Sequence, residues 1–245
     1  MAIIRISVPA PVWWIIAIFG VFALLVVIAN TNSAPQVDKI VWNEQMTKGN
    51  KDTAKHHFIM YTDVFCPYCD KFSDAVAANM EDFDKNYIED KNILFEIRVT
   101  DMNYVNGHST NSRPGGEAVY CAAKQGDFWS YYYALLAKIY KDYHSRGIGV
   151  DRNSEKIPTL SMDYFYDIAD NIDTLDRGKL VSCMENDETV KELDDNTTKA
   201  KSKVNGGVPR FVFDKYVADG FLGNWNTDND YKQVKLLMDA GLASK

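Results

Sequence analysis

The 245-residue sequence lacks several features that would assign it to common functional classes. Its 27 lysines and arginines are outnumbered by 34 aspartates and glutamates, so the net charge is −7 and we expect no surface for nucleic acid. It has no glycine-rich dinucleotide fingerprint, and therefore no motif for a cofactor of its own. No internal repeat or low-complexity block is present. One composite domain of about 190 residues accounts for most of the chain.

Candidate metal ligands are also scarce, because the chain has four cysteines and four histidines. A zinc site at Cys66 and Cys69 would need two more ligands at compatible spacing, but Cys121 and Cys183 are isolated from each other. The histidines form no ligand pair of the zinc-finger kind: His56, His57, His108 and His144. We therefore expect no metal site, and we place His56 and His57 at a strand edge.

Only one long hydrophobic run is present. Residues 12–29 contain no polar side chain and, as a helix, reach about 27 Å, close to the thickness of a bilayer core. Arg5 and the amino terminus give the short side a positive excess, which predicts a single-pass signal anchor in the cell membrane with residues 1–11 in the cytoplasm. A cleaved signal peptide is the alternative, although its apolar region usually spans only about 7 to 15 residues. In either case the rest of the chain is exported from the reducing cytosol to a compartment in which disulfides persist.

The rest of the chain reads as an α/β domain with a helical interruption. Residues 30–54 are polar and of mixed charge, which indicates a tether. Strands are predicted over 57–61 and 93–100, with a helix between them, and a hairpin over 211–222 precedes a final helix from about Thr227. Helical signals dominate between 108 and 205, including segments over 117–124, 128–143 and 175–185. Residues 55–107 and 206–245 therefore form one domain, and 108–205 an inserted helical subdomain.

An aromatic cluster lies in the second of these helical segments. We expect its side chains to fill the interface between the insert and the sheet, and a peptide-binding surface is the alternative. The cluster consists of Phe128, Trp129, Tyr131, Tyr132, Tyr133 and Tyr140.

The segment Cys66-Pro67-Tyr68-Cys69 carries the clearest chemistry, because two thiols separated by two residues can close a readily exchanged disulfide. Cys66 follows a predicted strand and begins a predicted helix, and Pro67 suits the first helical position. The free N–H groups and dipole of such a turn stabilise a thiolate and lower a cysteine pKa from about 8.5 to roughly 3.5–7.5. Cys66 is then the exposed, attacked sulfur and Cys69 the buried one. A purely structural local disulfide is the alternative.

A second element lies far along the chain, at Gly206-Gly207-Val208-Pro209. The glycines end a helix, and Pro209 precedes an apolar strand, a position where a cis X-Pro bond is possible. An ordinary loop proline is the alternative.

Together, the segment from Asp63 to Cys69, the aromatic segment 125–129 and the turn Gly207-Val208-Pro209 resemble, in this order, the DsbA-type thiol-disulfide oxidoreductases of the membrane-anchored or secreted branch. The resemblance covers roughly residues 49–243 and implies a thioredoxin fold with a helical insert. It also implies that Pro209 is a cis-proline packed against the disulfide and that Val208 offers its backbone to an extended substrate. One residue departs from the pattern of thioredoxin-fold enzymes, many of which carry a buried acid where this chain has Met60.

The resemblance predicts a monomer that introduces disulfides into reduced exported proteins, and that is reoxidised by a quinone-linked membrane oxidase of the DsbB or VKOR type. Two other functions stay open. One is a reductase or isomerase, for example in cytochrome c maturation. The other is a membrane-tethered chaperone or binding module that has kept the fold and an incidental disulfide.

The two remaining cysteines lie in the predicted insert. With Cys66 paired to Cys69, only a Cys121–Cys183 pairing is left among four exported cysteines, and the family branch often carries a pair in these contexts. We therefore expect a structural disulfide. Two buried free thiols are the alternative.

Overall fold

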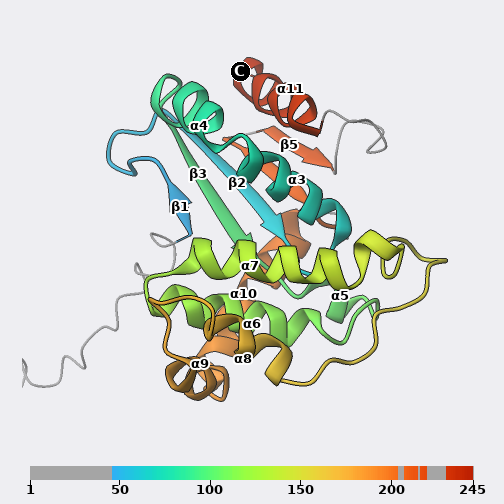
Figure 1. Cartoon of the computed structure of the whole chain (residues 1–245). Coiled ribbons are helices and arrows are strands. Elements are labelled where there is room, and N and C mark those ends of the chain that lie inside the picture. Colours follow the sequence, from blue (N-terminus) through green and yellow to red (C-terminus); the bar gives the residue numbers. More distant parts are fainter. Residues whose placement is uncertain (1–45, 204–206, 215, 220–229, 245) are drawn as a thin grey trace, which may run out of the picture. The chain divides into compact units, whose positions relative to one another are not determined.

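The computed structural model describes residues 46–203, 207–214, 216–219 and 230–244 (Figure 1). The chain divides into two compact units, and all of these residues belong to the second, Ile40–Lys245. The predicted cytoplasmic segment 1–11 and anchor 12–29 lie outside the described residues. Within them, none of the helices combines the length and the apolar character that a membrane span requires.

A five-stranded sheet with the order β1-β3-β2-β4-β5 forms the centre of this unit. Strands β2 (His56–Thr62) and β3 (Ile93–Val99) run parallel, as the helix between them requires. Strands β4 (Arg210–Phe213) and β5 (Tyr216–Asp219) add antiparallel to the β2 edge. The two predicted strands and the hairpin are confirmed, and the predicted continuation of the hairpin over 220–222 lies outside the described residues.

The predicted tether extends too far along the chain. Met46 is buried, and β1 (Thr47–Lys48) pairs antiparallel with β3, with Thr47 opposite Glu96. The domain boundary at residue 55 is therefore wrong, because residues 46–48 already belong to the sheet. An edge strand of two residues is too short to show a period-2 pattern, so the polar composition of the segment concealed it.

The core lies between the sheet and helix α3 (Pro67–Ala78). Alternate residues of the strands present aromatic side chains to this helix, so that Phe58 and Phe211 stack with ring centroids 5.7 Å apart and Phe72 of α3 lies 4.9 Å from Phe211. Helix α11 (Asp230–Ala243) packs beside α3. After α3 the chain continues through α4 (Met80–Phe83) and a π-helical turn η1 (Asp84–Glu89) into β3. The strand, helix and strand thus form the predicted β-α-β unit.

The helical insert is also confirmed. Helix α7 (Phe128–Asp142) packs against both α6 (Ser112–Lys124) and α3, so the insert is continuous with the core (Figure 1). The described elements of this region are α5 (Met102–Val105), α6 (Ser112–Lys124), α7 (Phe128–Asp142), the 3-10 turn η2 (His144–Arg146), α8 (Asp163–Ala169), α9 (Arg177–Met184) and α10 (Asp187–Lys203).

Helix α6 begins five residues earlier than the predicted start at Glu117. The sequence Pro114-Gly115-Gly116 suggests a break, but the structure uses both glycines for close contact. A Cβ atom on Gly115 would lie 2.7 Å from the Val64 side chain, and one on Gly116 would lie 2.9 Å from Leu193. Tertiary packing therefore outweighs the low helix propensity of glycine here.

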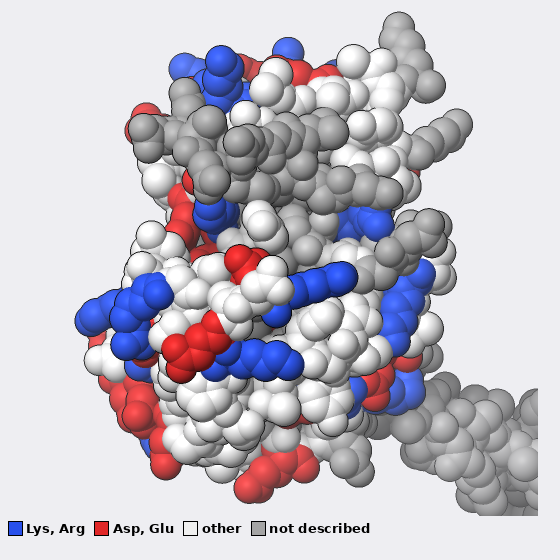
Figure 2. All heavy atoms as spheres, turned by 90° about the vertical axis from the view of Figure 1, so that its right-hand side faces the viewer, with Lys and Arg blue, Asp and Glu red and all other residues white. Residues whose placement is uncertain are grey.

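The aromatic cluster of α7 mainly packs in the core, as predicted. Phe128, Tyr131 and Tyr132 are fully buried, whereas Tyr140 is 46% exposed. On the face shown in Figure 2, basic and acidic side chains are interspersed and do not form a surface of one sign.

Candidate active site

Cys66 occupies the N-cap of α3, the position predicted for it. Its backbone is extended, its sulfur accepts a hydrogen bond from the Cys69 N–H at 3.4 Å, and Pro67 is the first helical residue. The Cys69 N–H is thus shared between this sulfur and the Cys66 carbonyl oxygen, which accepts from it at 3.0 Å. A negative charge on this sulfur would face the positive end of the helix dipole.

Both cysteines of the motif are free thiols in this structure, so it represents the reduced state. Cys69 is fully buried, as predicted, but Cys66 is only 4% exposed and is thus much less open than predicted. Tyr68, between them, is 44% exposed. Of the four residues of the motif, Tyr68 is thus the most accessible to a partner protein.

The predicted cis-proline is present beside this sulfur. The Val208–Pro209 peptide bond is cis, and the Cys66 thiol donates a hydrogen bond to the Val208 carbonyl oxygen at 3.3 Å. Pro209 is buried and Val208 is half-buried. The fold thus brings the turn before β4 against a cysteine 142 residues earlier in the chain. That Val208 offers its backbone to a substrate stays a prediction.

Burial raises the pKa of the Cys69 thiol well above its ordinary value, and the neighbouring Cys66 raises it further. The Asp63 N–H and the Thr62 side chain oppose this effect by hydrogen bonding to Cys69. At neutral pH, Cys69 is therefore a protonated and unreactive thiol until a reaction at Cys66 makes use of it.

Three buried hydroxyl groups lie around Cys69, and we call them the hydroxyl cluster. The Tyr132 hydroxyl lies 2.9 Å from that of Ser73 and 3.3 Å from that of Thr62. They come from α7, α3 and β2 respectively. The sequence did not reveal the cluster, because nothing local relates Tyr132 to Cys69. Met60, at the position of the missing acid, is fully buried in the core.

Asp63 is the nearest acid on the N-terminal side of the motif, and each of its carboxylate oxygens accepts a hydrogen bond from a backbone N–H group. One oxygen accepts from the Phe65 N–H at 2.9 Å and the other from the Asn103 N–H at 2.8 Å. Burial raises the pKa of Asp63 to about 6, and the two N–H donors limit the rise. Asp63 therefore ties the loop before Cys66 to α5.

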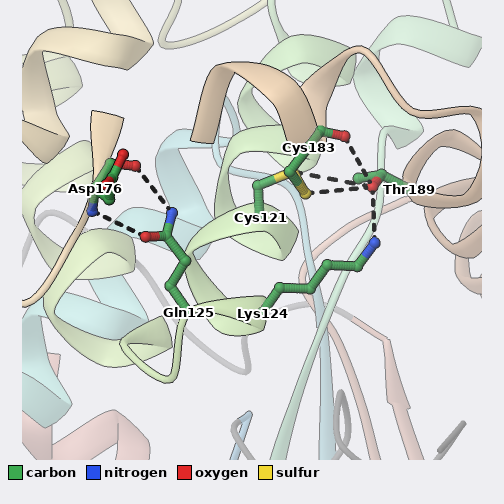
Figure 3. Close-up of a disulfide and its surroundings, with 6 residues drawn as sticks. All are labelled: Cys121, Lys124, Gln125, Asp176, Cys183 and Thr189. Carbon is green, nitrogen blue, oxygen red and sulfur yellow. Dashed lines mark hydrogen bonds between the residues drawn. A yellow bond between two sulfur atoms is a disulfide. The ribbon is translucent and has the colours of Figure 1, made fainter. Parts of the chain in front are cut away.

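The predicted structural disulfide is present between Cys121 of α6 and Cys183 of α9 (Figure 3). The Thr189 hydroxyl lies 3.5 Å from the Cys183 sulfur and donates to the Cys183 carbonyl oxygen, while Lys124 donates to Thr189. On the other side of the disulfide, the side chain of Gln125 and the backbone of Asp176 exchange two hydrogen bonds. The disulfide thus joins helices of the insert that are already tied by polar contacts.

Among the described residues, neither the candidate metal ligands nor the two histidines of β2 form a second functional site. In the described part of the chain, no three His, Cys, Asp or Glu side chains are grouped to hold a metal ion. His56 lies 2.8 Å from Asp214, and His57 lies 2.7 Å from Glu96. Both histidines of β2 are therefore engaged in hydrogen bonds with carboxylates.

The model of the family described as Thioredoxin matches residues 42–239. The chain therefore belongs to the thioredoxin family. The match begins before β1 and extends into α11, so the sheet and the helical insert are both included. No curated protein is recognisably similar to the chain in sequence.

Solved structures of low sequence identity share this fold. BdbD from Bacillus subtilis, in its oxidised form, is 15% identical with a TM-score of 0.55, over 81% of this chain and 92% of that one. The thiol-disulfide oxidoreductase MdbA from Corynebacterium diphtheriae is 18% identical with a TM-score of 0.53, over 78% and 87%. DsbA from Chlamydia trachomatis is 15% identical with a TM-score of 0.53, over 80% and 91%. The predicted DsbA-like fold is confirmed.

Proposed function

We propose that the chain is a thiol-disulfide oxidoreductase that introduces disulfide bonds into exported proteins. The observation that carries the proposal is the Cys66 sulfur, which caps α3 and lies 3.3 Å from the carbonyl oxygen before cis-Pro209. This arrangement places an exchangeable thiol at a helix N-terminus, with its buried partner one turn inside. The description of MdbA as a thiol-disulfide oxidoreductase supports the same class of activity here.

In the proposed reaction, the oxidised chain carries a Cys66–Cys69 disulfide. A substrate thiolate attacks the Cys66 sulfur, the bond to Cys69 breaks, and Cys69 leaves with the electron pair and takes up a proton. The product is a mixed disulfide between the substrate and Cys66. The burial of Cys69, which raises its pKa, favours its uptake of the proton.

A second substrate thiolate then attacks the substrate sulfur of the mixed disulfide. The substrate gains its disulfide, and Cys66 leaves as a thiolate. Two electrons have passed from substrate to chain, and of the two substrate protons one resides on Cys69 and the other goes to Cys66 or to solvent. Because the N-terminus of α3 stabilises an anion on Cys66, this cysteine is a good leaving group, which favours transfer of the disulfide to the substrate.

The reduced chain must return its electrons to another protein, because the sequence has no cofactor motif. We propose a membrane oxidase of the DsbB or VKOR type as that partner. We also propose that residues 12–29 anchor the chain in the cell membrane with the catalytic domain outside the cytoplasm. A membrane fraction that resists carbonate extraction and retains the original N-terminus supports the anchor, and an N-terminus beginning after Ala29 contradicts it.

The direction of electron flow is tested with the purified full chain. We expect the oxidised chain to convert a reduced peptide with two cysteines into its disulfide form, with one peptide disulfide formed per chain reduced. C66S is the matched inactive control, because it retains Cys69 but has no attackable disulfide. A wild-type chain that reduces insulin readily but oxidises no peptide would instead identify a reductase.

A further inference from the structure

A buried acid that directly follows the thiol motif in sequence contacts a buried histidine of the insert. Asp70 follows Cys69 in α3, and its Oδ2 lies 3.3 Å from Nδ1 of His144 in η2. The two side chains are 2% and 3% exposed. The pair therefore joins the first turns of the active-site helix to the insert, in a position shielded from solvent.

The pair is poorly explained as a structural clasp. The other oxygen of Asp70 and Nε2 of His144 are both buried and have no hydrogen-bond partner among the described residues. Buried polar atoms left in this way cost stability, and two well-packed apolar side chains would join the helices at least as well. The residue types therefore suggest a role for charge.

The charge of Asp70 bears directly on Cys66. The Asp70 N–H donates to the Cys66 carbonyl oxygen at 3.1 Å, so the two residues lie one helical turn apart. The dipole of α3 favours a thiolate at Cys66, whereas an uncompensated carboxylate four residues later opposes it. Burial raises the pKa of Asp70, while His144 and, more weakly, Lys71 oppose that rise.

We propose that His144 is a positioning residue that acts through Asp70: it carries the compensating positive charge, so that the N-terminus of α3 stabilises a thiolate at Cys66. The inference rests on the proposed function, for which this thiolate is the leaving group. His144 reaches the active site from the insert without touching either sulfur in any described contact. The insert would thus regulate the reactivity of a thiol on the other half of the domain.

Other charges near the pair act on it less directly. On α3, Lys71 and Asp74 both interact with Asp70, and Asp230 of α11 interacts with Asp74. Asp74 is exposed. Solvent screens its effect more than that of the buried histidine.

The experiment measures the alkylation rate of Cys66 by iodoacetamide in the reduced full chain from about pH 4 to pH 9, a range that covers thiolate formation by perturbed cysteines. We expect H144Q to raise the midpoint by about 0.5 to 1 pH unit, since Asp70 then lacks its counter-charge. At a pH below the midpoint, alkylation should slow by roughly three- to tenfold. H108Q is the matched control, because His108 is exposed.

The double variant D70N/H144Q separates charge from packing. If compensation is the role of His144, removing the acid as well returns the midpoint to near the wild-type value. An H144Q midpoint equal to the wild-type one, or a double variant shifted as far as H144Q, overturns the inference. Should H144Q fail to fold, D70N alone decides, because the inference requires its midpoint to lie at or below that of the wild type.

Equilibration with glutathione gives an independent readout that a purely structural role would not move. The reduced fraction of H144Q should fall relative to its oxidised fraction by the same factor as the alkylation rate. Both measurements concern the thiol pair alone, so they are independent of electron flow to substrates. If the wild-type chain oxidises no peptide but H144Q shifts as expected, only the proposed function fails.

Discussion

The hydroxyl group of Tyr132 lies 2.9 Å from that of Ser73, and this contact joins the insert to the helix that carries both redox cysteines. Tyr132 also reaches Thr62 at the end of β2. Three separate elements thus supply polar atoms around Cys69, in a chain that has Met60 where many thioredoxin-fold enzymes have a buried acid.

The hydroxyl cluster predicts that T62V slows the attack of Cys69 on a mixed disulfide at Cys66, the step that we call resolution. The variant removes the side-chain hydrogen bond that lowers the pKa of Cys69, so fewer Cys69 thiolates are available to attack a mixed disulfide at Cys66. The loss of about 1 kcal/mol corresponds to roughly fivefold slower resolution. Stopped-flow release of a chromophoric thiol from Cys66 measures this rate.

Two tyrosine variants complete this test. Y132F removes the hydroxyl that joins Thr62 to Ser73 and should slow resolution in the same direction, whereas Y140F alters an exposed tyrosine of the same helix and should not. Equal rates in wild type, T62V and Y132F would contradict a role for the cluster.

The unequal burial of the two thiols predicts that their variants fail differently. C66S should form no mixed disulfide, because Cys69 is fully buried. C69S should attack oxidised proteins through Cys66 and remain attached to them, since no resolving thiol is left. Non-reducing electrophoresis and peptide mapping identify the trapped complexes. If Cys69 proves to be the alkylated, trapping thiol, the assignment of roles is wrong.

The Cys121–Cys183 disulfide predicts a stability effect without loss of redox chemistry. It spans 62 residues, and loop-closure entropy assigns such a cross-link about 4 kcal/mol of stabilisation. The C121S/C183S variant should therefore unfold at a clearly lower urea concentration, yet still oxidise a reduced peptide at 25 °C. T189V, which keeps the disulfide and removes its polar neighbour, is the control. Coincident unfolding curves for all three proteins would contradict the prediction.

The raised pKa of Glu117 predicts that the free energy of unfolding falls as the pH rises. It is 9% exposed, and burial together with Asp101 and Asp194 raises its pKa to about 7, although Arg113 opposes the rise. Because the folded state favours the protonated form, this contribution is fully present below about pH 4.5 and is lost as pH rises through about 7. E117Q should be more stable than wild type at pH 8 by up to about 3 kcal/mol.

The measurement for Glu117 is urea unfolding at about pH 5 and pH 8, which bracket the titration. Asp63, with its pKa near 6, contributes in the same direction, so E117Q should reduce the dependence on pH without abolishing it. E155Q changes an exposed acid and should follow the wild type. Identical slopes for E117Q and wild type would refute the assignment.

The close packing at Gly115 predicts that a larger side chain in the insert changes the reactivity of Cys66. A Cβ atom there would lie 2.7 Å from Val64 and 3.0 Å from Phe65, which lie in the loop directly before Cys66. G115A should cost about 1 to 3 kcal/mol and slow alkylation of Cys66 by displacing that loop. G116A meets the end of the Leu193 side chain and should affect stability more than alkylation. Unchanged alkylation in folded G115A would contradict this link.

The sequence predicted those features that depend on local patterns. Cys66, Pro67 and Cys69 form one helix start, and alternation or helical spacing revealed β2, β3 and most helices. The role of Pro209 as a cis-proline beside the disulfide was implied by resemblance, and the Cys121–Cys183 pair was predicted by elimination, with the resemblance in support. The short β1 strand was missed for want of a pattern, and the start of α6 was placed too late, because glycine propensity says nothing of the close approach of Val64 and Leu193.

What the sequence could not predict are the contacts between distant segments around the thiols. The hydroxyl cluster combines β2, α3 and α7, and the Asp70–His144 pair bridges 74 residues. Nor could the sequence show that Cys66 is only 4% exposed, since exposure depends on how the Val208–Pro209 turn packs against it.

The position of α7 has a consequence for protein engineering. This helix contributes Tyr132 to the surroundings of Cys69, and His144 follows shortly after its end. A miniaturised protein with only the sheet, α3 and the Pro209 turn would therefore keep the motif but lose side chains that surround it. Grafting Cys66-Pro67-Tyr68-Cys69 onto another scaffold would likewise transfer the two sulfurs without the groups that determine when each one gains or loses a proton.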